Sequence, residues 1–348
     1  MIKSNLKQKG NEVIHYNPCC GNWSLTEYYN VMLTAFYKAG YRIYFDNDNN
    51  RMMAVKHNKR IPLYRNWVVS LTGWNTVNLL GDKWSVYKRI CQPYNLPHPT
   101  TRLFRFGIDN PTVCASYFKY PFVVKIRDGM GGRDCFPNVS NAKQLDQILG
   151  EIQRKGHKTV LFQKQLKGED HRVLVIGRGK NMKIQSVVSR RPARVIGDGI
   201  HTIKELVVSE NIERKQCGNH YKLVIDKWIL QAKGYTPDTI LSKHSVALIQ
   251  NNVNIALGGS LNTTPLNQVH PDNNKMFLKT ARMCQKVNQD QHAIWGFDYM
   301  TEDISKAYYN NGGAFNELNA NPDLGMYVFG SPPKNDWRQF TDIINYLI

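Results

Sequence analysis

An apolar strand that leads a lysine into a glycine-rich loop is the feature that most restricts how this chain can fold. The segment Tyr120–Asp134 reads YPFVVKIRDGMGGRD, and its loop contains Gly129, Gly131 and Gly132. Glycines let a backbone approach phosphate oxygens, and their amides can neutralise phosphate charge together with Lys125 and Arg133. The segment matches neither GxxxxGK[ST] nor GxGxxG. Alone, it predicts either a phosphate-binding loop or a hairpin with a flexible tip.

Three hard oxygen donors stand near the C-terminal end of the chain. Glu317 and Asn319 are two residues apart in an expected strand, so both side chains point to one face. Asp298 lies in the preceding expected strand and could lie opposite them. Such donors suit Mg²⁺, which keeps waters and shares phosphate oxygens. Acidic residues on strands are more often simply solvated, so this set needs support from its surroundings.

A third segment, Val160–Arg172, reads VLFQKQLKGEDHR and predicts a strand, a short turn and another strand. Such a connection could hold a flat base between backbone groups and Leu166, beginning at Gln163. Asp170 is placed to accept ribose hydroxyls. Without a parent pattern the segment is also compatible with an ordinary hairpin.

A fourth segment, Arg190–Leu206, reads RRPARVIGDGIHTIKEL and leads through a Gly-Asp-Gly turn and His201 into an expected helix. Two arginines near such a turn and a helix N-terminus would make a corner that receives an anion. The alternative is a surface turn.

The charge of the chain is strongly positive. Lys and Arg number 46 against 27 acidic residues, giving a net charge of +19 and a pI near 9.6. A positive field of this size attracts polyanions and speeds their encounter without selecting among them. Nucleic acid, nucleotide phosphates and acidic peptides all remain open as partners, as does a solubility trait of the source.

The seven cysteines are scattered and form no CxxC pair, which favours reduced thiols over a disulfide framework or a zinc site. No apolar run is long enough to cross a bilayer, so no membrane partner is expected. The polar N-terminus lacks the apolar core of a secretory signal, and we therefore expect a cytoplasmic protein.

The order of expected strands and helices predicts an α+β fold rather than a regular Rossmann sheet. Residues 1–80 are expected to form a small α/β domain, with a helix over 28–39 and a hairpin over 41–57. A larger domain spans 81–335: its first lobe, 81–165, holds the phosphate loop, and its second, 166–335, holds the metal ligands. A long helix is expected over 275–291, and a C-terminal helix over 336–348.

Taken together and in this order, these segments resemble the ATP-grasp domain of cyanophycin synthetase and of related bifunctional glutathione synthetases. The likeness covers roughly residues 82–330. The motifs that carry it are VVKIRDGMGGR, GDGIHTIKEL, VHPDN (269–273), GFDYM and ELNANP. It implies an ATP-grasp fold, in which two α/β lobes clamp ATP.

The resemblance also implies roles for individual residues. The proposed ligands of ATP are Lys125 with Lys83 or Lys88, the loop Gly129–Arg133, Gln163 to Leu166 for adenine, and Asp170 for ribose. Asp298, Glu317 and Asn319 would hold Mg²⁺. The residues that would face the carboxylate being activated are Arg172, Arg190, Asn254, Gly258, Gly259, Ser260 and, near the anion corner, His201.

The sequence also departs from the family pattern at several positions. Gln163 stands where the family has glutamate, and Ile126 replaces a proline. An expected arginine is replaced by Gln250 or Asn251, and Asp323 and Tyr327 replace a glycine and a histidine. The three candidate metal ligands match the family pattern, whereas residues expected near the substrates differ from it. The resemblance therefore does not imply that cyanophycin is the product.

The resemblance thus predicts an ATP-dependent carboxylate–amine ligase that adds an amino acid to an amino acid or peptide, possibly an acidic one. One alternative is a ligase that modifies a protein or a ribosomal peptide. Another is a basic nucleic-acid-binding or scaffold protein with a degenerate ATP-grasp fold, which the intact metal set does not favour. A homo-oligomer stays open.

Overall fold

The computed structural model describes residues 27–46, 51–64, 67–68, 71–129, 134–216, 222–231, 233–250, 253, 258–322 and 338–348. Several predicted site residues lie outside this part of the chain, namely Gly131, Gly132, Arg133 and Asn254.

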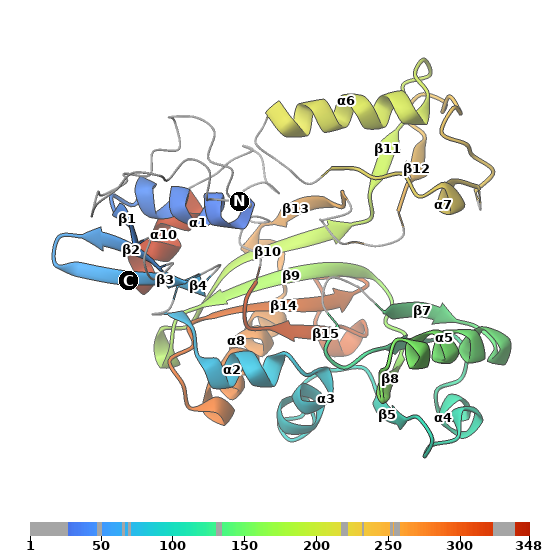
Figure 1. Cartoon of the computed structure of the whole chain (residues 1–348), viewed down its shortest axis with the longest axis horizontal. Coiled ribbons are helices and arrows are strands. Elements are labelled where there is room, and N and C mark those ends of the chain that lie inside the picture. Colours follow the sequence, from blue (N-terminus) through green and yellow to red (C-terminus); the bar gives the residue numbers. More distant parts are fainter. Residues whose placement is uncertain are drawn as a thin grey trace.

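A five-stranded antiparallel sheet forms the centre of the molecule (Figure 1). Its strands, in spatial order, are β13 (Ser260–Thr264), β10 (Lys183–Arg191), β9 (Glu169–Ile176), β14 (Ile294–Thr301) and β15 (Ala314–Asn319). Side chains alternate between the two faces of a strand. One face packs its apolar residues against α8 (Pro271–Asn288) and the region of α2 (Trp74–Leu80).

The first lobe is a separate four-stranded sheet covered by two helices. Its strands, in spatial order, are β5 (Thr101–Arg105), β8 (Thr159–Lys164), β6 (Phe122–Lys125) and β7 (Cys135–Val139). The helices α4 (Pro111–Phe118) and α5 (Ala142–Arg154) complete its core. Phe162 stacks between Phe104 and Phe122, with ring centroids 5.4 Å apart in both pairs. The apolar run of β6 is therefore buried, and its last residue, Lys125, leaves this core on the side of the central sheet.

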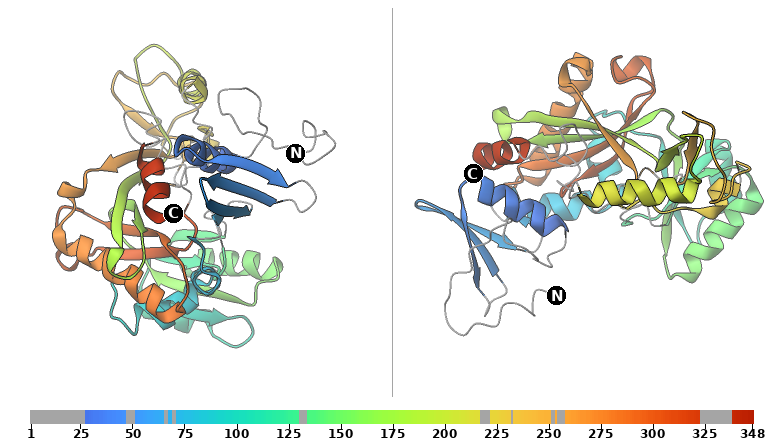
Figure 2. Two further views of the ribbon diagram at one scale, coloured as in Figure 1. Left: turned by 90° about the vertical axis from the view of Figure 1, so that its left-hand side faces the viewer. Right: turned by 90° about the horizontal axis from the view of Figure 1, so that it is seen from above.

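The N-terminal part is a helix and an antiparallel sheet. Helix α1 (Glu27–Lys38) precedes β1 (Arg42–Asp46), β2 (Arg51–Lys56), β3 (Lys59–Tyr64) and β4 (Trp67–Val68). The predicted helix and hairpin are confirmed, whereas β3 and β4 were not predicted. The C-terminal helix α10 (Arg338–Leu347) lies beside α1 (Figure 2). This part shares one apolar core with Leu174, Ile176 and Val188 of the central sheet, so a domain boundary near residue 80 stays a prediction.

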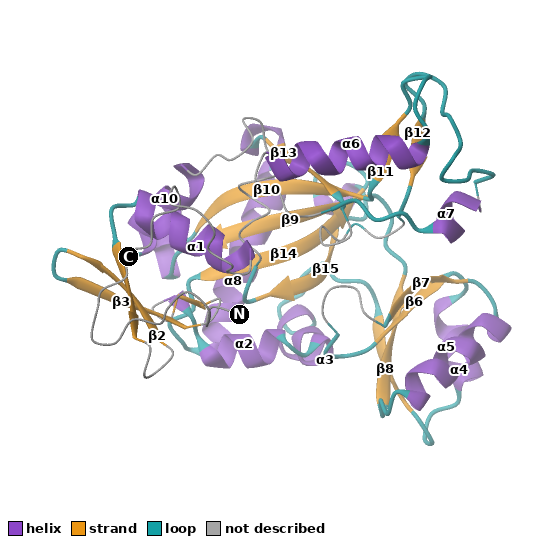
Figure 3. Ribbon diagram, turned by 45° about the horizontal axis from the view of Figure 1, so that its top comes forward, coloured by secondary structure: helices purple, strands orange, loops and turns teal. Residues whose placement is uncertain are grey.

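A small unit extends from the end of β10. It consists of β11 (Arg194–Ile196), β12 (Val246–Leu248), α6 (Ile203–Gln216) and α7 (Lys227–Gln231), around a core of its own. Helix α6 lies away from β14 and β15 in both Figure 1 and Figure 3. Its first turn is a capping box, in which the Glu205 carboxylate accepts from Thr202 N at 2.9 Å and Thr202 Oγ1 accepts from Glu205 N at 3.2 Å.

The ends of α8 show how the sequence sets helix limits. The sequence predicts this helix over 275–291, but it runs from Pro271 to Asn288. It starts earlier because His270 Nδ1 accepts from Asp272 N and Pro271 suits the first helical position. It ends earlier because Gln289 adopts the left-handed conformation, with φ of 52°. Of the helices in the described ranges, none has the length and apolarity that a membrane span requires.

We expect the buried His292 to make the fold sensitive to acid. Its Nδ1 accepts from Gly73 N at 3.0 Å, and burial lowers its pKa from 6.5 to about 4. The unfolded chain therefore binds a proton that the folded chain excludes, and stability present above pH 6.5 is lost as pH falls toward 4. The loss should be on the order of 3 kcal/mol. Since burial also lowers the pKa values of His98 and His171, guanidinium unfolding at pH 7 and pH 4.5 is compared between the wild type and His292→Gln. His292→Gln should flatten this dependence, and an unchanged dependence in that variant would contradict the assignment.

Candidate active site

Charged side chains from three strands meet on one face of the central sheet. Asp170 of β9 lies opposite Arg190 of β10, and Arg172 of β9 lies opposite Asp298 of β14. Asp170 and Arg172 share a face because they are two residues apart. All four side chains are buried.

The four residues form a continuous ion-pair network. Arg172 Nε lies 2.6 Å from Asp298 Oδ1, and Arg190 Nη2 lies 3.1 Å from Asp298 Oδ2. Arg190 Nε also donates to Asp170 Oδ1 at 2.6 Å. Burial alone would lower the pKa of Arg190, but Asp298 and Asp170 together raise it above its usual range. Arg190 therefore keeps its charge within this network, whereas burial raises the pKa of its partner Asp170.

Strand β15 adds the remaining predicted metal ligands to this face. Glu317 lies opposite Asp298, and Asn319 lies opposite Gly296. The expected position of Asp298 opposite this pair is confirmed, since it faces Glu317 directly and Asn319 lies two residues further along the same face. Asn319 Nδ2 is buried and has no hydrogen-bond partner among the residues that the structure describes.

The first lobe and the helix before it bring two lysines to β15. Lys83, at the start of α3 (Lys83–Val86), has its Nζ 3.2 Å from Glu317 Oε1 and also donates to the carbonyl of Gly129. Lys125 Nζ lies 3.4 Å from both the carbonyl oxygen and Oδ1 of Asn316. Burial lowers the pKa of Lys125. Two lysines and the start of the glycine loop thus converge on one strand.

Asp82 explains why Lys83 is held at this point. Its carboxylate caps α3 by accepting from Trp84 N at 3.0 Å, and it also pairs with Arg127. Lys83 N donates to the carbonyl of Arg127 at 3.1 Å. The helix start is therefore attached to the segment that follows β6. Asp82, Arg127 and Asn316 were not predicted as site residues, and only the Asp82 cap could have been recognised from the sequence.

The three oxygen donors Asp298, Glu317 and Asn319 suit an Mg²⁺ ion that is also bound by phosphate better than an Mg²⁺ ion bound by protein alone. Asp298, Glu317 and Asn319 offer hard oxygens on one face, as Mg²⁺ requires. However, within the described ranges no group of three His, Cys, Asp or Glu side chains is arranged to hold a metal alone. The basic groups Arg172, Arg190, Lys83 and Lys125 also outnumber the three carboxylates of Asp170, Asp298 and Glu317. Their excess charge favours a cation that arrives with a polyanion.

The strand, turn and strand predicted over Val160–Arg172 are present as β8, a short connection and β9. Gln163 is buried, and its Nε2 donates to Thr101 Oγ1 at 2.8 Å. Leu166 is half-buried in the turn that follows. Asp170 takes part in the ion-pair network through Arg190, so a ribose contact would compete with that pairing and stays a prediction.

Gly168 in this connection should tolerate no side chain. Its φ is +101°, and a Cβ would lie 2.1 Å from the carbonyl oxygen of Thr301. Gly107 also has a positive φ, +75°, but a Cβ there meets nothing within 4 Å. We expect Gly107→Ala to cost about 1–2 kcal/mol of conformational strain, and Gly168→Ala about 1–3 kcal/mol more. Denaturant unfolding of both variants tests this, and equal losses would contradict the close approach.

Several predicted residues are not brought to this cluster. Lys88 is exposed, and its Nζ donates to Gln92 Oε1 at 2.7 Å. Of the two lysines proposed as alternatives, Lys83 is therefore the one that reaches β15. His201 pairs with Asp198 within its own exposed turn, at 2.6 Å, which favours the surface-turn interpretation of that segment. Gly258 and Gly259 are buried, and Gly258 packs against the backbone of Leu223. Ser260 lies opposite Arg191, on the other face of the sheet from Arg190.

A row of aromatic rings beside the lysines was not predicted. The Trp84 and Tyr87 ring centroids are 5.6 Å apart, and those of Tyr87 and His98 are 5.2 Å apart. Burial, and after it the charge of Lys125, lower the pKa of His98 to about 4. The ring of His98 is therefore neutral at pH 7.

No protein-family model matches the sequence. The structure superposes on the crystal structure of a bifunctional glutathione synthetase from Pasteurella multocida with a TM-score of 0.62 and 19% identity, over 91% of this chain and 44% of that chain. The fold is therefore the ATP-grasp fold, as predicted.

The sequence is also similar to ATP-grasp ligases. The chain is 30% identical over 280 residues to cyanophycin synthetase of Crocosphaera subtropica, a match that covers 78% of this chain and 30% of that protein. It is 27% identical over 217 residues to a bifunctional glutathione biosynthesis protein of Clostridium perfringens, covering 60% of this chain and 26% of that protein. The predicted resemblance to these ATP-grasp ligases is confirmed. The chain spans less than a third of the length of either relative.

Proposed function

We propose that the chain is an ATP-dependent carboxylate–amine ligase that forms an amide bond and releases ADP and phosphate. The observation that carries this proposal is the convergence of Lys83 and Lys125 with Asp298, Glu317 and Asn319 on one face of the central sheet. The proposal is further supported by the resemblance to proteins named as synthetases of cyanophycin and glutathione.

Each group in the cluster has a chemical task in this proposal. Lys83 and Lys125 bind the phosphate oxygens, so Lys83 exchanges its contact with Glu317 for one with phosphate. Asp298, Glu317 and Asn319 would hold Mg²⁺, which would neutralise phosphate charge. Arg172 and Arg190 bind the substrate carboxylate, because their planar guanidinium groups match its two oxygens. The remaining ion pairs keep these groups oriented before the substrates arrive.

The reaction follows from this arrangement of charge. A carboxylate oxygen of the substrate forms a bond to the γ-phosphorus, and the bond from that phosphorus to the oxygen of ADP breaks. The lysines stabilise the oxygens on which negative charge accumulates. An amine nitrogen then attacks the acyl carbon, phosphate leaves, and the amine proton is lost. No protein nucleophile is needed.

The proposed substrates are an amino acid and an amino acid or peptide, with an acidic acceptor favoured by the net charge of +19. A ligase that modifies a protein or a ribosomal peptide would use the same site. The basic charge gives weak support to a nucleic-acid-binding scaffold, for which Asp298 and Glu317 would have no use. A cytoplasmic location is part of the proposal.

A screen for ADP release tests the proposed function. The purified chain is incubated with Mg²⁺ and ATP, and with single amino acids paired with acidic or neutral peptides of matched length. We expect ADP release that needs both substrates and is faster with acidic peptides. Equal rates with neutral peptides would contradict the preference for an acidic acceptor. ADP release at the same rate with and without amino acids and peptides would contradict ligation.

A further inference from the structure

The apolar pattern of β15 does not fit a regular strand. Phe315 and Leu318 are both buried in the core against α8, although they are three residues apart. Phe315 makes ring contacts with Phe277 at 6.1 Å and with Phe297 at 5.5 Å. Strict alternation puts residues three apart on opposite faces. The strand must therefore change phase between them.

A β-bulge at Asn316 makes this change. Ala314 lies opposite Met300 and Phe315 opposite Tyr299, but Asp298 then faces Glu317 and not Asn316. Unbroken pairing would place Glu317 opposite Phe297, on the core face. The extra residue therefore turns Glu317 and Asn319 toward Asp298, which is a known use of bulges beside active sites.

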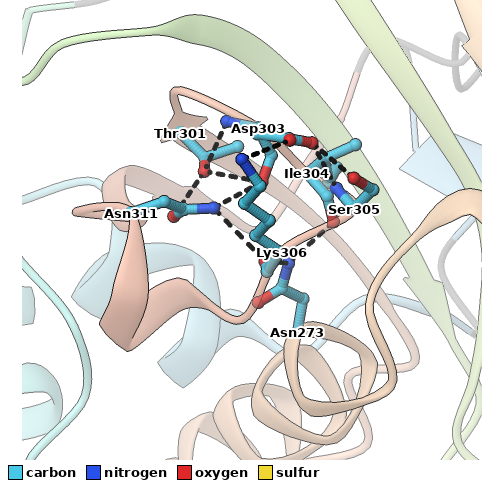
Figure 4. A network of polar contacts seen from close by, with 7 residues as sticks. All are labelled: Asn273, Thr301, Asp303, Ile304, Ser305, Lys306 and Asn311. Atoms are coloured by element: carbon cyan, nitrogen blue, oxygen red, sulfur yellow. Dashed lines mark hydrogen bonds and ion pairs between the residues drawn. The ribbon is translucent and has the colours of Figure 1, made fainter.

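The connection between the two strands must hold this register. Residues 302–313 join β14 to β15, and a connection of this length does not fix a register as a two-residue turn does. It is held by a polar network (Figure 4). Thr301 Oγ1 donates to Asn311 Oδ1 at 2.8 Å, and the same oxygen accepts from Gly313 N at 3.2 Å.

Asn273 ties this network to the rest of the molecule. It stands in the first turn of α8 and is fully buried. Its Nδ2 donates to the carbonyls of Ile304 at 3.0 Å and Lys306 at 2.9 Å, and its Oδ1 accepts from Tyr308 N at 2.8 Å. One side chain thus bonds three backbone groups of the connection, as Figure 4 shows for Ile304 and Lys306.

We propose that Asn273 is a positioning residue of the candidate active site. By fixing the 302–313 connection to α8, it holds the register and the bulge that turn Glu317 and Asn319 toward Asp298. The proposal rests on the proposed function for the roles of those side chains. It also gives a task to the VHPDN segment (269–273), which the mechanism above leaves unused.

Asn273→Asp tests the proposal, because it keeps the acceptor for Tyr308 N and removes both donors. Cys284→Ala is the matched control, since it opens a cavity in the same core on the same helix and leaves the connection intact. Thr301→Val provides a second variant inside the network, should Asn273→Asp fail to fold. Amide hydrogen exchange over residues 302–319 is measured below the unfolding transition, together with the Mg²⁺ dependence of ADP release.

In Asn273→Asp we expect exchange over 314–319 to accelerate at least about tenfold, with no such change in Cys284→Ala. The Mg²⁺ concentration for half-maximal ADP release should rise by a similar factor. Equal exchange in Asn273→Asp and the control would overturn the claim about register. Faster exchange with unchanged Mg²⁺ dependence would overturn the link to the site. If the wild type releases no ADP, the proposed function fails, whereas the exchange comparison still decides the claim about register.

Discussion

Glu317→Gln is expected to lower kcat for ADP release by about two to three orders of magnitude, in line with the loss of a preorganised charge at a transition state. The amide keeps the size of the side chain but removes the negative charge that faces Asp298 and Lys83. The stability of the fold should hardly change. The Lys83–Glu317 pair is partly exposed, and such pairs contribute at most about 1 kcal/mol.

Steady-state kinetics and denaturant unfolding together test this prediction. The matched control is Glu213→Gln, which makes the same change at an exposed position of α6. It should leave both kcat and the unfolding midpoint unchanged. Full activity in Glu317→Gln, or a loss of activity that merely follows unfolding, would contradict the assignment of Glu317 to the metal site.

Asp298→Ala should instead destabilise the fold by about 3–5 kcal/mol, because removing one partner of a buried pair leaves an uncompensated charge. Asp298 is buried between Arg172 and Arg190. After its removal Arg190 keeps Asp170, but Arg172 loses the carboxylate 2.6 Å from its Nε. The penalty therefore falls mainly on Arg172. Guanidinium unfolding of the variant measures it.

The double variant Asp298→Ala/Arg172→Met distinguishes this cause from a general packing defect. Removing the unpaired guanidinium should restore part of the lost stability, so the two substitutions should not be additive. Additive losses would show that the destabilisation does not come from an unpaired Arg172. Activity should be lost in both the single and the double variant, since neither retains the carboxylate.

The sequence predicted those parts of the site whose signals are local. Lys125 and Gly129 follow directly from an apolar strand that ends in a glycine loop. Glu317 and Asn319 share a face because they are two residues apart, and the structure agrees. The helix that begins after Thr202 was also predicted, because its signals lie in neighbouring residues.

The remaining features depend on contacts between distant segments. Spacing along the chain cannot show that Asp298 pairs with two arginines, or that Lys83 rather than Lys88 reaches Glu317. The bulge at Asn316 is a partial exception. Two large apolar residues three apart, Phe315 and Leu318, indicate a break in the strand, but they do not identify the extra residue.

The structure brings together some of the residues that the resemblance named and leaves others apart. The resemblance identified Arg172 and Arg190, which do meet on one face with Asp298. It also named His201, which is paired with Asp198 in an exposed turn. The difference is physical: the first two are on central strands, whose positions the sheet fixes, whereas His201 is on the outlying unit that carries α6.

The nucleotide product of the reaction tests the central claim most directly. The chain is incubated with Mg²⁺, ATP and an active carboxylate substrate, with hydroxylamine in place of the amine, and the products are separated. An acyl phosphate predicts ADP and phosphate in equal amounts, with one hydroxamate formed for each ADP. AMP with pyrophosphate, or ADP without hydroxamate, would contradict the account.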